Sequence, residues 1–209
     1  MKLVSLIIPA YNEVDYIRTT LHQALDYFSG RGIASELIVA ADGNDGTREA
    51  ALEVAHTFRH LGTRMRVIGS PERRGKGLAV REAVQLAEGD IIGFSDADNK
   101  TPISEFNKIE SRLLEGFDVV IGSRSLPESQ IEQMQPLYRR LGSKGFDVVK
   151  RLCIGLDDIS DTQCGFKFFV AHVARDLFRR QTIDGYMFDV EILFIARQLG
   201  YQIAQVPVR

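Results

Sequence analysis

The stretch DIIGFSDAD, residues 90–98, joins a short apolar run to two aspartates that are separated by one residue. An apolar run of this length predicts a buried β-strand. Asp96 and Asp98 then follow at its carboxyl end, with both side chains on the same side of the backbone. Ligands of open α/β sheets bind at this end of the strands, so the pair predicts a cation site, with a solvated turn as the alternative.

The residues on either side of this stretch alternate between strand and helix patterns. Apolar runs predict strands at residues 3–8, 37–41, 66–68, 90–95, 117–121 and 203–208. Helical spacing of apolar residues predicts helices over residues 17–28, 51–58, 80–87, 101–113, 172–180 and 187–199. Pro9 is expected to stop the first strand, and Thr101 and Pro102 to begin a helix as its cap and first residue. The alternation predicts one α/β domain with a mostly parallel sheet and helices on both faces.

Polar residues follow several of the predicted strands. The carboxyl ends of parallel strands meet at one edge of a sheet, so we expect Asn12, Asp42, Asp96 and Arg124 at the same rim. Two carboxylates suit Mg²⁺ or Mn²⁺ and leave coordination positions for the phosphates of a substrate. The run RGKG, residues 74–77, begins a helix and either attracts a diphosphate or is a plain helix start.

Composition excludes several classes of protein. A net charge of −2 gives no reason to expect a nucleic-acid partner. Two unpaired cysteines argue against a disulfide framework and for a reducing compartment. The sequence contains no run of about 20 apolar residues that would span a bilayer. The basic stretch at residues 138–152 predicts either a solvated helix face or an element at a membrane surface or anion site.

Four short motifs in order resemble those of the inverting glycosyltransferases of family 2, which have the nucleotide-sugar-binding GT-A fold. They are SLIIPAYNE at residues 5–13, DGNDGT at 42–47, RGKG at 74–77 and DAD at 96–98. The resemblance implies one catalytic domain over residues 1–209, with a nucleotide-sugar-binding half at 1–124 and an acceptor-binding half at 125–209. Many relatives continue into membrane-associated helices, which leaves a truncation at the C-terminus open.

The second half is similar to the dolichyl-phosphate sugar transferases, including the mannose synthases. GSR at 122–124, RR at 139–140 and FDVE at 188–191 carry this likeness, and DTQCGFK at 161–167 is closest to the glucosyltransferases. The resemblance implies transfer of a hexose, with glucose expected first, from UDP-glucose or GDP-mannose to polyprenyl (dolichyl) phosphate. It also implies a cytoplasmic protein, peripheral at the cytosolic face of a membrane. A soluble or saccharide acceptor, or a non-catalytic sugar-nucleotide-binding module, remains open.

On the donor side, the resemblance implies that Pro9, Tyr11 and Glu13 hold the nucleoside, with Tyr11 as a face for the base. Asp42 would bind the nucleoside too, and Lys76 belongs to the same donor-binding set.

On the catalytic side, Asp96 and Asp98 would take the sugar and a Mg²⁺ or Mn²⁺ diphosphate. Arg124 and Arg139 would clamp the acceptor phosphate, with Arg140 as a neighbouring candidate. A phosphate acceptor is already an anion, so it needs positioning more than a base. Asp189 and Glu191 are either base candidates or structural carboxylates. Lys100 stands where some relatives have a metal-binding Gln.

Overall fold

The computed structural model describes residues 2–58, 64–126, 129 and 156–209. The predictions on Arg139, on Arg140 and on the whole basic stretch at residues 138–152 lie outside the described residues. The described strands are β1 (Val4–Tyr11), β2 (Ser35–Asp42), β3 (Arg64–Ile68), β4 (Ile91–Ser95), β5 (Val119–Ser123), β6 (Phe166–Val170) and β7 (Ile203–Pro207). The described helices are α1 (Val14–Gly30), α2 (Thr47–Phe58), α3 (Lys76–Leu86), α4 (Phe106–Leu114), α6 (Ala171–Arg180), α7 (Phe188–Gln198) and the short 3-10 helix η2 (Ile103–Glu105).

The seven strands form one sheet in the order β3-β2-β1-β4-β6-β5-β7. All neighbouring pairs are parallel except those of β6, which runs antiparallel to both β4 and β5. The predicted α/β domain with a mostly parallel sheet is therefore confirmed. Because β4 and β5 point the same way as β1 and β2, the loops after all four strands meet at one rim.

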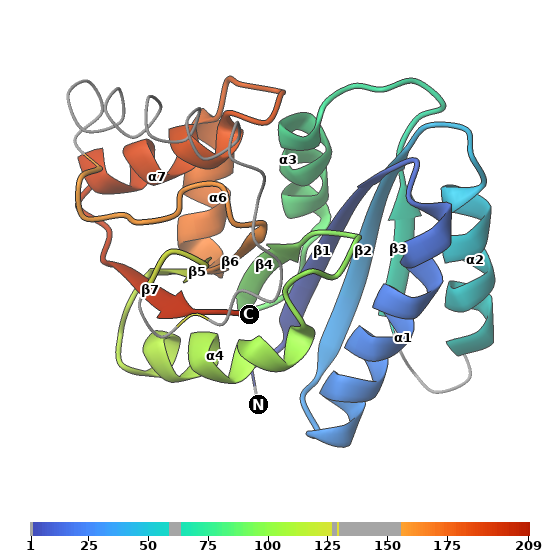
Figure 1. Ribbon diagram of the computed structural model, residues 1–209, viewed down its shortest axis with the longest axis horizontal. Helices are drawn as coiled ribbons and strands as arrows, with labels where there is room; N and C mark the ends of the chain where they lie inside the picture. The colour runs from blue at the N-terminus through green and yellow to red at the C-terminus, as the bar shows by residue number, and fades with distance from the viewer. Residues whose placement is uncertain (1, 59–63, 127–128, 130–155) are drawn as a thin grey trace.

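Helices cover both faces of the sheet (Figure 1). One core packs α1, α2 and α4 against the sheet, with Phe28 and Phe106 fully buried where α1 meets α4. The other core packs α3, α6 and α7 against the opposite face, around Phe94 and Phe188. The apolar strands read as near-continuous runs because each of their faces is covered by a helical layer.

Two local predictions are wrong. The first strand does not stop at Pro9 but continues to Tyr11, with Pro9 opposite Ala40 of β2. Pairing of β1 with β4 ends at Ile7, so beyond that point β1 has a partner on one side and tolerates a residue without an N–H. Pro102 is extended and occupies the cap position of η2, so it is not the first helical residue and Thr101 is not the cap.

Candidate active site

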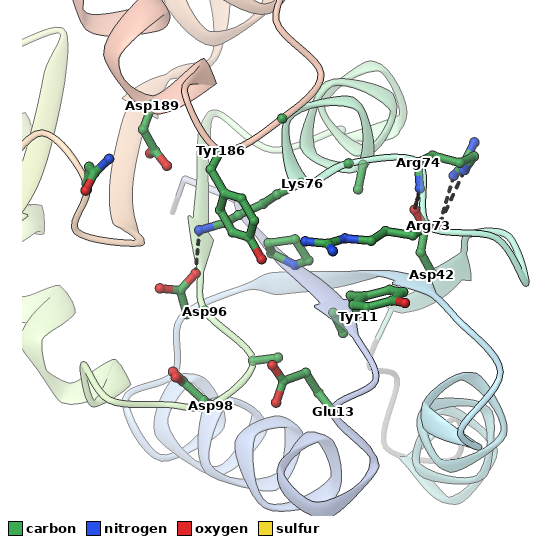
Figure 2. A pocket seen from close by; sticks show the side chains of 17 residues that line it. Tyr11, Glu13, Asp42, Arg73, Arg74, Lys76, Asp96, Asp98, Tyr186 and Asp189 are labelled. Carbon is green, nitrogen blue, oxygen red and sulfur yellow. Dashed lines mark hydrogen bonds and ion pairs between the residues drawn. The ribbon is translucent and has the colours of Figure 1, made fainter.

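A cleft of about 660 Å³ lies at the carboxyl ends of β1, β2 and β4 (Figure 2). Its size is that of a site for a small molecule or cofactor. Residues of both predicted halves line it. They are Pro9, Ala10, Tyr11, Glu13, Asp42, Arg73, Arg74, Gly75, Lys76, Ala79, Asp96, Ala97, Asp98, Gln163, Gly185, Tyr186 and Asp189. The structure thus brings together the predicted donor-site residues from four separate segments.

An aromatic and cationic stack forms one wall of the cleft. The guanidinium carbon of Arg73 lies 4.8 Å from the ring centroid of Tyr11 and 5.9 Å from that of Tyr186. Both rings are exposed, Tyr11 by 40% and Tyr186 by 62%. The ring of Tyr11 lines the cleft and is covered by Arg73, and its predicted contact with the base stays a prediction. Sequence reasoning missed Arg73 and Tyr186, because nothing in their local patterns marks them as neighbours.

Asp42 organises the loop that carries this arginine. Its carboxylate accepts hydrogen bonds from the backbone N–H of Ser70 and of Arg74, and from the Arg74 side chain. Only 4% of Asp42 is exposed. The carboxylate borders the cleft, yet several of its acceptor positions are already used by the loop. Its predicted contact with the nucleoside stays a prediction.

Lys76 and Asp96 form an ion pair in the middle of the cleft. The Nζ of Lys76, the first residue of α3, donates to Oδ1 of Asp96 at 2.6 Å. Burial would lower the pKa of Lys76, but the charges of Asp96 and Asp189 outweigh burial and raise it. The Asp96 carboxylate also packs against Gly165, where any Cβ would overlap it. Lys76 is thus a fixed positive charge between two carboxylates.

Asp98 and Glu13 add further negative charge beside Asp96. Asp98 is paired with Lys100, whose Nζ lies 2.5 Å from Oδ2. Burial raises the pKa of Glu13, and the charge of Asp98 raises it further. A carboxyl whose pKa rises because of neighbouring acids marks a place that favours a cation.

The oxygen donors at Asp96 and Asp98 fit a divalent cation. Among the residues that the structure describes, no group of three or more His, Cys, Asp or Glu side chains converges on one point. Mg²⁺ is commonly bound by one or two carboxylates together with substrate phosphates and water, so two carboxylates at a cleft suffice. Lys76 and Lys100 hold these carboxylates, and a cation has to compete with both ammonium groups.

Arg124 lies at the same rim, after β5, but not among the residues that line the cleft. Its Nε donates to Asp161 at 2.9 Å. Burial would raise the pKa of Asp161, but the hydrogen bonds and charge of Arg124 lower it overall. The predicted phosphate clamp is therefore in an ion pair with Asp161 here. Its proposed partner Arg139 lies beyond the described residues.

The two base candidates on α7 differ in their surroundings. Glu191 accepts hydrogen bonds from the backbone N–H of Thr182 and Ile183 and from the Thr182 hydroxyl, so it holds the segment before α7. Asp189 faces the cleft but is paired with the buried Lys167, at 2.5 Å. Glu191 thus has the structural contacts, and Asp189 is not a free carboxylate.

Comparison with known proteins identifies the family. The model of the family described as "Glycosyl transferase family 2" matches residues 5–174. The chain belongs to glycosyltransferase family 2. The matched residues carry β1, the Asp42 loop, the start of α3 and the Asp96–Asp98 pair. The family expected from the four motifs is confirmed.

Relatives of this family-2 chain include dolichyl-phosphate beta-glucosyltransferases. One from Drosophila melanogaster is 33% identical over 218 residues, with 99% of this chain and 66% of the relative covered. Another from Dictyostelium discoideum is 32% identical over 216 residues, with 98% and 65% covered. A third, from Trichomonas vaginalis, is 32% identical, with 98% and 62% covered. This chain therefore spans less than two thirds of the length of these relatives.

Solved structures confirm the fold of this family-2 domain. Glucosyl-3-phosphoglycerate synthase from Mycobacterium tuberculosis, in complex with Mn²⁺, UDP and phosphoglyceric acid, has a TM-score of 0.72 and 23% identity. The match covers 99% of this chain and 68% of that one. The same enzyme with Mg²⁺ and UDP gives a TM-score of 0.72 at 22% identity and covers 99% and 69%. At this identity the likeness shows the GT-A fold alone.

Proposed function

We propose that this domain transfers a hexose, glucose before others, from a nucleotide sugar to a polyprenyl phosphate. One observation carries the proposal. A single cleft joins the face of Tyr11, the ammonium of Lys76 and the carboxylates of Asp96 and Asp98. These three features suit the base, the diphosphate and a cation that bridges to it. The names of the curated relatives support glucose and dolichyl phosphate as substrates.

The donor lies along the cleft from Tyr11 to Asp96. The base stacks on Tyr11 once Arg73 has moved aside, because the guanidinium at 4.8 Å leaves no room for a ring between them. The diphosphate then reaches Lys76 at the start of α3, where the helix dipole adds positive potential. UDP-glucose is the first candidate, and GDP-mannose is the alternative.

Asp96 and Asp98 would hold Mg²⁺ or Mn²⁺. When bound, such a cation stabilises the negative charge that develops on the departing nucleoside diphosphate. Lys76, paired with Asp96 at 2.6 Å, is placed to contact the same phosphates. The mycobacterial enzyme of the same fold was solved with Mn²⁺ and with Mg²⁺, which supports a divalent cation as the cofactor.

The acceptor is an anion that attacks without a strong base. Of the carboxylates that line the cleft, all but Glu13 have a basic partner among the described residues: Asp42 with Arg74, Asp96 with Lys76, Asp98 with Lys100 and Asp189 with Lys167. Paired carboxylates are poor general bases, whereas a phosphate needs only to be oriented. Arg124 and Arg139 would supply that orientation after Arg124 leaves Asp161.

A lipid phosphate would bring the domain to the surface of a membrane, at its cytosolic face. No helix in the described part of the chain combines the length and the apolarity that crossing a bilayer requires. We propose a peripheral contact with the membrane because the proposed acceptor is a lipid phosphate.

The test is transfer of labelled glucose from UDP-glucose to dolichyl phosphate in lipid vesicles with Mn²⁺. We expect label in the organic phase with the wild-type domain and none with Asp98→Asn. Parallel reactions contain GDP-mannose as donor, or 3-phosphoglycerate as acceptor. Label transferred only to the water-soluble acceptor would refute the lipid acceptor. Binding of the donor without any transfer would refute the proposed activity and favour a non-catalytic sugar-nucleotide-binding module.

A further inference from the structure

Lys167 is an ammonium group buried in the sheet beneath the cleft. It lies on β6, opposite Phe94 of β4 and Ile121 of β5, and none of its surface is exposed. Its Nζ donates to Oδ1 of Asp189 at 2.5 Å and to the carbonyl oxygen of Cys164 at 2.6 Å. A charge at such depth requires partners, and the sequence motifs give this lysine no role.

Asp189 interacts with a second ammonium group as well. Figure 2 shows the Lys76 side chain ending between Asp96 and Asp189. Lys76 donates to Asp96 at 2.6 Å, and the Asp189 carboxylate lies on the other side of the ammonium group (Figure 2). Both Lys76 and Asp189 line the cleft. Two carboxylates therefore compete for the ammonium that the proposed function assigns to the diphosphate.

We propose that Lys167 is a positioning residue of the diphosphate site: by pairing with Asp189, it leaves Lys76 with Asp96. The inference rests on the proposed function, because it gives Lys76 the donor's diphosphate. Lys167 itself never touches the substrate. Lys167 acts only through Asp189, which it contacts in the sheet and which lines the cleft.

Substitution of Lys167 alone breaks this arrangement in a defined direction. In Lys167→Met the Asp189 carboxylate has lost its buried partner, which is strongly unfavourable. Lys76 already interacts with Asp189, so it turns from Asp96 toward Asp189 and away from the diphosphate. Removal of both charges, in Lys167→Met with Asp189→Asn, takes away the competing carboxylate, and Lys76 returns to Asp96.

The experiment compares the affinities of UDP, GDP and uridine in the presence of Mn²⁺ by titration calorimetry. For the diphosphate that the wild type binds, we expect a roughly tenfold or greater loss in Lys167→Met, because a hydrogen bond to a charged group is lost. Uridine affinity stays unchanged. The double variant binds the diphosphate within about threefold of wild type, and Asp189→Asn alone does not lose affinity, since Lys76 remains with Asp96.

A matched control is Lys108→Met. Lys108 also pairs with a nearly buried carboxylate, Glu105 at 2.5 Å, but lies on α4 outside the cleft. It should leave both affinities unchanged.

Three results would overturn the inference while the proposed function stands. The first is wild-type affinity for the diphosphate in a folded Lys167→Met. The second is a double variant that binds the diphosphate as weakly as Lys167→Met does. The third is a tenfold loss of diphosphate affinity in Asp189→Asn. Should Lys167→Met fail to fold, a tenfold loss of diphosphate affinity in the double variant or in Asp189→Asn would overturn the inference. A wild-type domain that binds neither UDP nor GDP would instead refute the proposed function, and this inference with it.

Discussion

Gly165→Ala is predicted to disable the cation site without replacing any residue assigned to it. Gly165 has a φ outside the left-handed region, so its backbone accepts alanine. A Cβ at this position would overlap both oxygens and the carbon of the Asp96 carboxylate. Each of these atoms is far inside the 3.5–4.0 Å or so at which carbon atoms make contact, so the carboxylate must move by more than about 1 Å.

That displacement sets the expected magnitudes. The Lys76 to Asp96 distance of 2.6 Å grows beyond hydrogen-bonding range. Turning Asp96 to a strained rotamer costs about 0.5–1.5 kcal/mol, which lowers Tm by about 1–6 °C for a chain of this size. Displacement of a metal-site carboxylate is expected to weaken Mn²⁺-dependent UDP binding by about 10- to 100-fold.

The assay is calorimetric titration of UDP with and without Mn²⁺, alongside a thermal melt. Gly185→Ala is the control, because Gly185 also lines the cleft and an added Cβ meets nothing within 4 Å. Gly185→Ala should bind UDP as the wild type does. Unchanged Mn²⁺-dependent binding in a folded Gly165→Ala would refute the role given to Asp96, and an equal loss in Gly185→Ala would show a general effect of alanine.

Four further outcomes are expected. Tyr11→Ala should weaken uridine binding by about 5- to 150-fold, the range for loss of one stacked base, and calorimetry without metal measures it. Asp98→Asn should abolish the increase in Tm that Mn²⁺ adds to that of UDP, and a persisting increase would contradict the metal assignment. The pKa of Glu13 is raised above its ordinary 4.5, so its ionised form destabilises the fold as pH rises through 4.5 and the folded-state pKa. Glu13→Gln should therefore be more stable than wild type at neutral pH and equal to it in acid, whereas a pH-independent difference in Tm would exclude this cause. The pKa of Asp161 is lowered below 3.8, so its pairing with Arg124 stabilises the fold above that pH and is lost as pH falls through the folded-state pKa. Asp161→Asn should lower Tm at pH 7 more than at pH 3, and equal losses would argue against the ion pair.

Much of this fold follows from local patterns. The strand at residues 90–95 is a short apolar run, and the helix at 17–28 has apolar residues at helical spacing. Each pattern is typical of one type of element, so both were predicted correctly. The prediction that Pro9 ends the first strand was wrong because a proline ends a strand only where its missing N–H would have had a partner. Which neighbours β1 has at Pro9 depends on the sheet and not on the local sequence. The same holds for β6, since an apolar run does not specify an antiparallel place between β4 and β5.

The candidate site shows a similar division. Asp96 and Asp98 follow an apolar run closely enough to be found from sequence, and the shared rim brings Asp42 near them. Lys167 could not be found this way, because its partner Asp189 is 22 residues distant and meets it only through the packing of α7 on the sheet. Arg73 and Tyr186 lie in segments without a period, so their approach to Tyr11 is a product of tertiary structure.

A crystal structure of the domain with UDP and Mn²⁺ tests the central claim most directly. We expect an anomalous manganese peak bonded to oxygens of Asp96 or Asp98 and of the diphosphate, with uracil on the ring of Tyr11 and Arg73 displaced. Nucleotide bound away from β1 and β4, or manganese with no ligand from either aspartate, would contradict it.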